Sequence, residues 1–297
     1  MSTVHFIRAT LFTVAVTFAG LPVSAQQGPI KPFKDALFSG QAVLESADGG
    51  DYQVLDYQEM RDINGRDQVP ERRVKNAYVA TSIKRQQVDL RLLEGSAHAQ
   101  NVTQVGDPAR AAFAVIFIHG RGGDRRLGAN DYSFGGNFNR LKNLVAGSGG
   151  VYYAPSVADF GQRGSGDIAA LIGHVSGRGQ GQSARPVVLA CASMGGMICS
   201  GIARDPQAAA RLAGMVILGG PPDAAYASTP AGKRKLPIYF VQGSNDSVYK
   251  AADQVAVYRK LRGAGHPVRF TLFQTGSHGT PIRMIDWRAA LNFVLSR

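Results

Sequence analysis

Three residues in the C-terminal half of the chain, Ser193, Asp246 and His278, have the types that nucleophilic acyl transfer requires. A serine hydroxyl is a weak nucleophile at neutral pH and needs an imidazole to accept its proton. The imidazole in turn needs a carboxylate that fixes its tautomer and stabilises its cation. These requirements predict Ser193 as nucleophile, His278 as general base and Asp246 as the residue that orients His278.

The segment around Ser193 is typical of a sharp strand-to-helix turn. An apolar run is followed by Cys191–Ala192–Ser193–Met194–Gly195–Gly196. Such a turn needs small residues because strand and helix come close together, and Gly195 and Gly196 meet that need on the helix side. On the strand side stands Cys191, which is small but is not the usual glycine. An ordinary glycine-containing loop is the alternative interpretation of this segment taken alone.

A second glycine-rich segment, His119–Gly120–Arg121–Gly122–Gly123–Asp124, follows the apolar run that ends at Ile118. A loop of this kind can turn a backbone N–H toward the oxyanion of an acyl-transfer intermediate. We predict that the N–H groups of Arg121 and Met194 form this oxyanion hole and that His119 is structural. A phosphate-binding loop is the alternative, but no Lys–Ser/Thr pair follows at the required spacing.

Six short, mainly apolar runs predict the strands that must position these residues. Several of them show no alternation of apolar and polar residues, which is typical of strands buried on both faces of a parallel sheet. The runs are 114–118, 151–153, 186–190, 215–218, 238–241 and the alternating run 268–273. Helical patterns at 251–261 and 285–295 complete βαβ units. We therefore expect an α/β fold with a mostly parallel central sheet and helices on both faces. In such sheets, sites lie at the carboxyl ends of the strands.

The N-terminal third has a different character. Residues 51–57 and 87–92 alternate apolar and polar side chains, which predicts half-buried antiparallel strands at the sheet edge. Ile63–Asn64–Gly65–Arg66 is a loop signal between them, and residues 26–50 are expected to be a loosely ordered lead-in. We predict one domain over 51–297, with N-terminal strands in 51–105 and a catalytic core in 111–297. Residues 51–105 could alternatively be a small accessory module.

Over 111–297 the sequence resembles the α/β-hydrolase superfamily, particularly its small esterases without a large lid. The resemblance rests on His119–Gly120, the Ser193 turn, Gly243–Asp246 and Gly276–His278, and Cys191 departs from the pattern. It implies the α/β-hydrolase fold, carboxylic ester hydrolysis through an acyl-enzyme, and no metal or organic cofactor. It also favours Asp246 over Asp223 as the acid, through its Gly–x–x–Asp arrangement.

The resemblance also bears on the substrate. Only a short segment connects the runs near Leu218 and Pro237, so no helical lid is expected and the site should be open. Loops on a rigid scaffold carry specificity, which makes the segment Arg121–Phe138 the candidate for substrate contacts. We predict contacts from Gly120, Arg125, Arg126 and Tyr132. The basic side chains suggest esters that carry a carboxylate or phosphate near the scissile bond.

The other reactive side chains have weaker claims. Cys191 and Cys199 flank Ser193, and we expect them to be buried core residues, because a strand-turn-helix path makes a Cα separation within roughly 7 Å difficult. His98 lies in a polar loop, His174 in a helical stretch and His266 before a strand.

Composition limits the class of protein. Apolar residues make up 44% and charged residues 18% of the 297 residues, which excludes a disordered chain, and two cysteines exclude a disulfide-dense scaffold. The formal net charge is +12. The first 25 residues, with a basic n-region, an apolar stretch 9–19 and Val23–Ser24–Ala25, predict a secretory signal peptide cleaved after Ala25. That apolar stretch is shorter than the ~20 residues needed to span a bilayer.

We therefore expect an exported protein, periplasmic or secreted, with no stable membrane insertion after cleavage. Its basic surface would favour anionic polymers or acidic substrates over nucleic acid, or would have no specific partner. The expected partner is a small-molecule or polymer-attached ester. The alternatives are a peptidase, amidase or thioesterase with the same triad, or a catalytically inactive binding or envelope protein.

Overall fold

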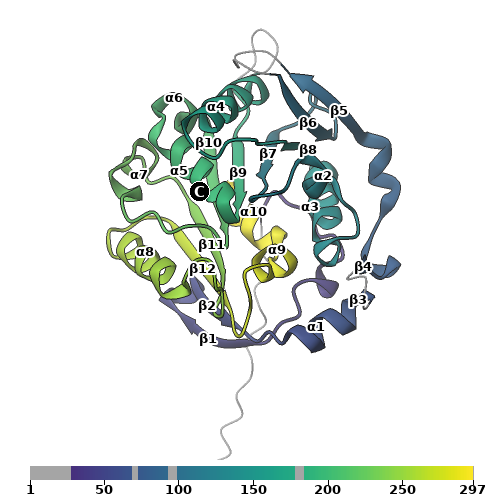
Figure 1. Ribbon diagram of the computed structural model, residues 1–297, viewed down its shortest axis with the longest axis vertical. Helices are drawn as coiled ribbons and strands as arrows, with labels where there is room; N and C mark the ends of the chain where they lie inside the picture. The colour runs from purple at the N-terminus through teal and green to yellow at the C-terminus, as the bar shows by residue number, and fades with distance from the viewer. Residues whose placement is uncertain (1–27, 69–72, 93–98, 178–183, 297) are drawn as a thin grey trace, which may run out of the picture.

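A ten-stranded mixed sheet organises the computed structural model, which describes residues 28–68, 73–92, 99–177 and 184–296. The strand order is β1-β2-β12-β11-β10-β9-β7-β8-β6-β5 (Figure 1). The strands are β1 Val43–Ala47, β2 Tyr52–Leu55, β5 Gln87–Leu92, β6 Gln100–Val105, β7 Phe113–Ile118, β8 Gly150–Pro155, β9 Val187–Ala192, β10 Leu212–Leu218, β11 Ile238–Gly243 and β12 Val268–Phe273. A separate ribbon pairs β3 Asp67–Gln68 with β4 Arg73–Val74. The predicted signal peptide and His98 lie outside the described residues.

The prediction of a mostly parallel sheet is confirmed. Strands β8, β7, β9, β10, β11 and β12 pair in parallel along the centre. The antiparallel N-terminal strands divide between the two edges: β5 and β6 extend one edge beside β8, and β1 and β2 extend the other beside β12. Strand β2 itself is parallel to β12. Figure 1 shows the two edges on opposite sides of the molecule. Alternation indicates a half-buried strand but does not reveal its neighbour.

Two hydrophobic cores lie on opposite faces of the sheet. In β7, Ala114, Ile116 and Ile118 enter one core, and Phe113, Val115 and Phe117 enter the other. The first core is covered by α4 Gln162–Ser176, α5 Gly196–Arg204, α6 Pro206–Ala210, α7 Pro230–Lys233 and α8 Ala251–Gly263. The second is covered by α2 Arg125–Ala129, α3 Asn137–Gly147, α9 Thr280–Met284 and α10 Trp287–Leu295. This burial on both faces explains the unbroken apolar runs.

Short 3₁₀ turns complete the described secondary structure. They are Asp35–Leu37, Asp48–Gly50, Asn76–Tyr78, Thr81–Gln86, Phe134–Gly136, Ser193–Gly195 and Tyr226–Ser228. No helix in the described ranges is both long and apolar enough to cross a bilayer.

One expectation for the N-terminal region was wrong. Residues 63–66, expected to form a loop, end helix α1 Glu59–Arg66, whose first turn carries Glu59 and Asp62 in positions that favour a helix. The described part of the predicted lead-in, residues 28–50, includes the 3₁₀ turn Asp35–Leu37 and strand β1. Ile30 and Phe38 are buried, and the Ile30 N–H donates to the side-chain oxygen of Asn292 at 2.9 Å. Ile30 belongs to the second core, and the polar composition of the segment gave no sign of this contact.

Candidate active site

Ser193 stands on the sharp turn between β9 and α5. Its φ of 51° lies in the left-handed region, which is strained for a residue with a side chain and is often found at reactive positions. Two glycines permit the close approach of neighbouring segments. A Cβ at Gly195 would lie 2.7 Å from the carbonyl oxygen of His119, and one at Gly120 would lie 2.8 Å from the Cβ of Ser193. The predicted strand-to-helix turn is therefore present, and its glycines are sterically required.

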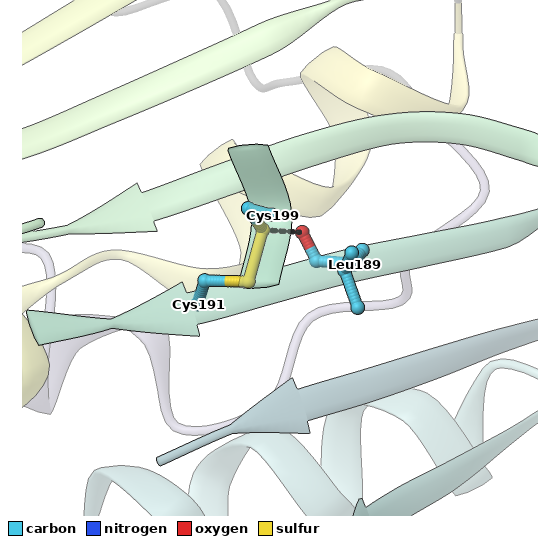
Figure 2. Close-up of a disulfide and its surroundings, with 3 residues drawn as sticks. All are labelled: Leu189, Cys191 and Cys199. Atoms are coloured by element: carbon cyan, nitrogen blue, oxygen red, sulfur yellow. Dashed lines mark hydrogen bonds between the residues drawn. A yellow bond between two sulfur atoms is a disulfide. The ribbon is translucent and has the colours of Figure 1, made fainter. Parts of the chain in front are cut away.

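A disulfide joins Cys191 of β9 to Cys199 of α5 across this turn (Figure 2). The expectation of unpaired core cysteines was wrong, although both residues are buried. The turn at Ser193 folds the start of α5 back over the strand and brings the two Cα atoms to 6.2 Å, within the range of a disulfide. Cys199 Sγ also lies 4.0 Å from the carbonyl oxygen of Leu189. The strand before Ser193 and the helix after it are thus covalently connected.

Ser193, His278 and Asp246 form a hydrogen-bonded chain. Ser193 Oγ lies 2.7 Å from His278 Nε2, and His278 Nδ1 lies 2.8 Å from Asp246 Oδ2. A proton on Nδ1, donated to the carboxylate, leaves Nε2 as the acceptor for the serine hydroxyl. The Asp246 side chain is fully buried and that of His278 is 27% exposed. The structure therefore brings together three residues that come from the ends of β9, β11 and β12.

The Asp246 carboxylate is fixed by its own loop. Oδ1 accepts the N–H groups of Val248 at 2.8 Å and Tyr249 at 3.0 Å, and Oδ2 accepts a hydrogen bond from Gln242 Nε2 at 2.8 Å. Gln242 Nε2 also donates to the Tyr249 carbonyl oxygen at 2.9 Å. These contacts orient Oδ2 toward His278. Gln242 was not predicted as a site residue, although a polar residue at the end of a buried strand is a usable signal.

The rival acid, Asp223, lies elsewhere. It accepts two hydrogen bonds from Arg204, at 2.7 and 2.9 Å, on the α5 side of the sheet. Its charge is used in that ion pair, and the acid that contacts His278 is Asp246.

A cleft of about 410 Å³ opens beside Ser193 and His278. Its wall combines the backbone of two loops with apolar side chains. The lining residues are Gly120, Arg121, Gly123, Leu127, Phe134, Ser193, Met194, Val248, Tyr249, His278, Gly279 and Ile282. The Tyr249 ring lies 5.8 Å from the His278 ring, centroid to centroid. The cleft can therefore hold a small, largely apolar substrate with a polar group at Ser193.

His119 is buried beneath the loop that carries Gly120 and Arg121. Its Nδ1 donates to the Gly120 carbonyl oxygen at 2.7 Å, and its Nε2 accepts the N–H of Val157 at 2.9 Å. The bond from the Val157 N–H requires an unprotonated Nε2 and hence the neutral imidazole, and burial lowers the pKa of His119. The Gly120 carbonyl and the Arg121 N–H belong to one peptide plane and point in opposite directions. The bond from His119 therefore turns the Arg121 N–H away from the imidazole.

The structure places Arg125 and Arg126 outside the cleft. Asp124 caps α2 by accepting the Arg126 N–H at 2.8 Å, and neither arginine is among the residues that line the cleft. Arg125 pairs with Asp89 at 3.0 Å, and Arg126 pairs with Asp124. The predicted substrate contacts of these two arginines are therefore not supported.

Tyr132 does not line the cleft either, because its ring packs under the guanidinium group of Arg73, 3.4 Å from the ring centroid. Gly120 does line the cleft. Four residues of the predicted segment line the cleft: Arg121, Gly123, Leu127 and Phe134. The apolar character of Leu127 and Phe134 within a mixed segment gave no separate signal in the sequence.

A larger surface groove, about 1110 Å³, lies along α4, α5 and α6 and contains neither Ser193 nor His278. It is lined in part by Phe160, Met197, Arg204, Pro206, Pro221 and Asp223. Size alone would therefore point to the wrong site. In the described part of the chain, no cluster of three or more His, Cys, Asp or Glu side chains is placed to hold a metal ion. His174 is exposed in the last turn of α4, and His266 is buried just before β12.

No protein-family model and no curated protein sequence matches the chain. Solved structures are similar in fold. A thermostable esterase superposes with a TM-score of 0.54 at 16% identity, over 72% of this chain and 64% of its own. The Pyrococcus furiosus esterase Pf2001 gives 0.51 at 14% identity, over 71% and 92%. A protein of unknown function from Agrobacterium tumefaciens, ATU1826, assigned to the α/β hydrolases, gives 0.53 at 15%, over 71% and 95%.

These similarities show that the protein has the α/β-hydrolase fold, as the sequence resemblance implied. The chain spans less than two thirds of the length of the thermostable esterase.

Proposed function

We propose that this protein is an exported serine hydrolase that cleaves carboxylic esters through an acyl-enzyme. The observation that carries the proposal is the hydrogen-bonded chain from Ser193 through His278 to Asp246, at the mouth of a cleft. The esterases among the structural neighbours support it.

In the proposed reaction, His278 Nε2 takes the hydroxyl proton as Ser193 Oγ attacks the ester carbonyl. The N–H groups of Met194 and Arg121 stabilise the oxyanion of the tetrahedral intermediate. The intermediate collapses as His278 returns the proton to the departing alcohol, leaving an acyl group on Ser193. Water, activated by the same histidine, then releases the acid. Asp246 keeps its charge throughout and orients His278.

Two observations support export. The N-terminal sequence has the pattern of a cleavable leader. The Cys191–Cys199 disulfide fits an oxidising compartment, because cytosolic proteins are kept reduced. We propose a periplasmic or secreted location, which fractionation of cells carrying the full chain would test: protein retained in the cytosol with its leader uncleaved contradicts it.

Labelling with a fluorophosphonate probe tests the nucleophile. We expect the purified protein to be labelled and Ser193→Ala to be unlabelled, with turnover of p-nitrophenyl esters reduced by about 10⁴- to 10⁶-fold. Ser200→Ala is the matched control, because Ser200 lies on α5 and lines the larger groove. Label retained by Ser193→Ala, or absent from the folded native protein, contradicts the proposal. Amide analogues of the best ester then separate an esterase from an amidase.

A further inference from the structure

The cleft beside Ser193 is uneven in charge. Among the described residues that line it, Arg121 has the one permanent charge, and no aspartate or glutamate is present. Asp246 is close along the hydrogen-bond chain, but its side chain is fully buried behind His278. An anionic group that enters the cleft therefore meets a positive charge with no carboxylate on the wall to oppose it.

Arg121 differs from the arginines that follow it in the chain. Arg125 pairs with Asp89 and Arg126 pairs with Asp124, so both are already engaged within the protein. The exposed side chain of Arg121 makes no ion pair or hydrogen bond with any described residue. A guanidinium group can bind a carboxylate through two parallel N–H donors. Arg121 is therefore available to a ligand.

The topology places Arg121 on the acyl side of a bound ester. In the sheet, β9 with Ser193 lies between β7, which leads into the Arg121 loop, and β11 and β12, which lead to Asp246 and His278. Since His278 must protonate the departing alcohol, the alcohol lies toward His278. The acyl portion then extends toward the Arg121 loop, where Leu127 and Phe134 supply apolar wall.

We propose that Arg121 selects esters whose acyl portion ends in an anionic group, such as half-esters of dicarboxylic acids. This inference rests on the esterase function proposed above. The methylene chain of the substrate packs against Leu127 and Phe134, and its terminal carboxylate binds the Arg121 guanidinium. The sequence predicts that basic side chains of the segment Arg121–Phe138 favour anionic esters. In this proposal the basic side chain is that of Arg121, for which the sequence predicts only a backbone role.

The test compares two substrates of equal length: the mono-p-nitrophenyl ester of adipic acid, and the same ester with the distal carboxylate replaced by a carboxamide. We expect the native protein to favour the anionic ester in kcat/KM, and Arg121→Gln to lower this preference by about 10-fold. Arg121→Gln keeps the backbone N–H, and any disturbance of the oxyanion hole affects both esters and cancels in the ratio. Arg121→Glu should reverse the preference.

Arg126→Gln is the matched control and should leave the ratio unchanged, because Arg126 pairs with Asp124 outside the cleft. Added salt should weaken the preference of the native protein and not that of Arg121→Gln. A ratio unchanged by Arg121→Gln, with both esters hydrolysed, overturns the inference and leaves the esterase proposal standing. Hydrolysis of neither ester, nor of simple p-nitrophenyl esters, overturns both.

Discussion

The two sides of the candidate triad are held by different forces. On the serine side, a disulfide and two glycine contacts position the backbone between β9 and α5. On the acid side, side-chain and backbone hydrogen bonds to Asp246 position the carboxylate. The position of Ser193 therefore depends on a covalent bond and on steric fit, whereas the position of the Asp246 carboxylate depends on hydrogen bonds. Substitutions that keep shape but change chemistry should harm the second side far more than the first.

Apart from removal of the nucleophile by Ser193→Ala, Asp246→Asn is expected to have the largest effect. It preserves the shape of the side chain and removes the charge that holds His278 in the tautomer needed to accept a proton, so kcat should fall by about 10⁴-fold. Asp223→Asn is the matched control and should change kcat little, because Asp223 pairs with Arg204. Steady-state kinetics on a p-nitrophenyl ester gives both values. A native-like rate for Asp246→Asn would show that the Asp246 carboxylate is not needed to orient His278.

Gly120→Ala tests steric fit on the serine side. The added methyl group would lie 2.8 Å from the Cβ of Ser193 and must displace Ser193 or the loop that carries Gly120 and Arg121. We expect kcat to fall by about 10²-fold, the scale of losing one oxyanion donor. Gly147→Ala, in α3 with open space at the added methyl, serves as control and should leave kcat unchanged. Equal kcat values for the two variants would contradict close packing of Gly120 against Ser193.

The disulfide should matter more for stability than for turnover. Replacing both Cys191 and Cys199 by alanine removes a crosslink that closes a short loop, with an expected loss of about 2–3 kcal/mol in the free energy of unfolding. Urea denaturation of the oxidised native protein and the double variant measures this loss. Because the glycine contacts remain, kcat should change by less than about 10-fold, which is under 1.4 kcal/mol. A loss of kcat comparable to that of Asp246→Asn would make the disulfide the main support of Ser193.

The smallest expected effect is a pH dependence of stability through His119. Burial lowers its pKa in the folded protein, so the unfolded chain binds the proton more tightly. The stability is complete above the unfolded pKa of about 6.5 and decreases as the pH falls below that value toward the folded pKa. His119→Gln should remove this part of the dependence, and His174→Gln, at an exposed position, should not. Urea denaturation between pH 8 and pH 5 compares the three proteins, and parallel profiles would exclude the assignment.

The sequence predicts well those features that local pattern determines. Strands β7 to β11 appear as apolar runs because they are buried on both faces. The residues after β9, β11 and β12 meet because parallel strands end at one edge. Features that depend on the distance between residues in the folded structure were not predicted. The approach of Cys191 to Cys199, and the ion pairs that Arg125 and Arg126 form with Asp89 and Asp124, depend on where the helices lie, which spacing in the sequence does not reveal. The division of the N-terminal strands between two edges is likewise a long-range property.

The outermost strand, β1, has a consequence for how molecules of this protein meet one another. Its residues are exposed, including Val43 and Leu44, and its outer side faces no other described strand. Such an edge is a template for pairing with a second chain. The pairing of β1 with β2 is irregular between Val43 and Glu45, and Glu45 places a charge on the edge. At this edge of the sheet, resistance to edge-to-edge association therefore resides in one irregular, charged strand that does not line the cleft.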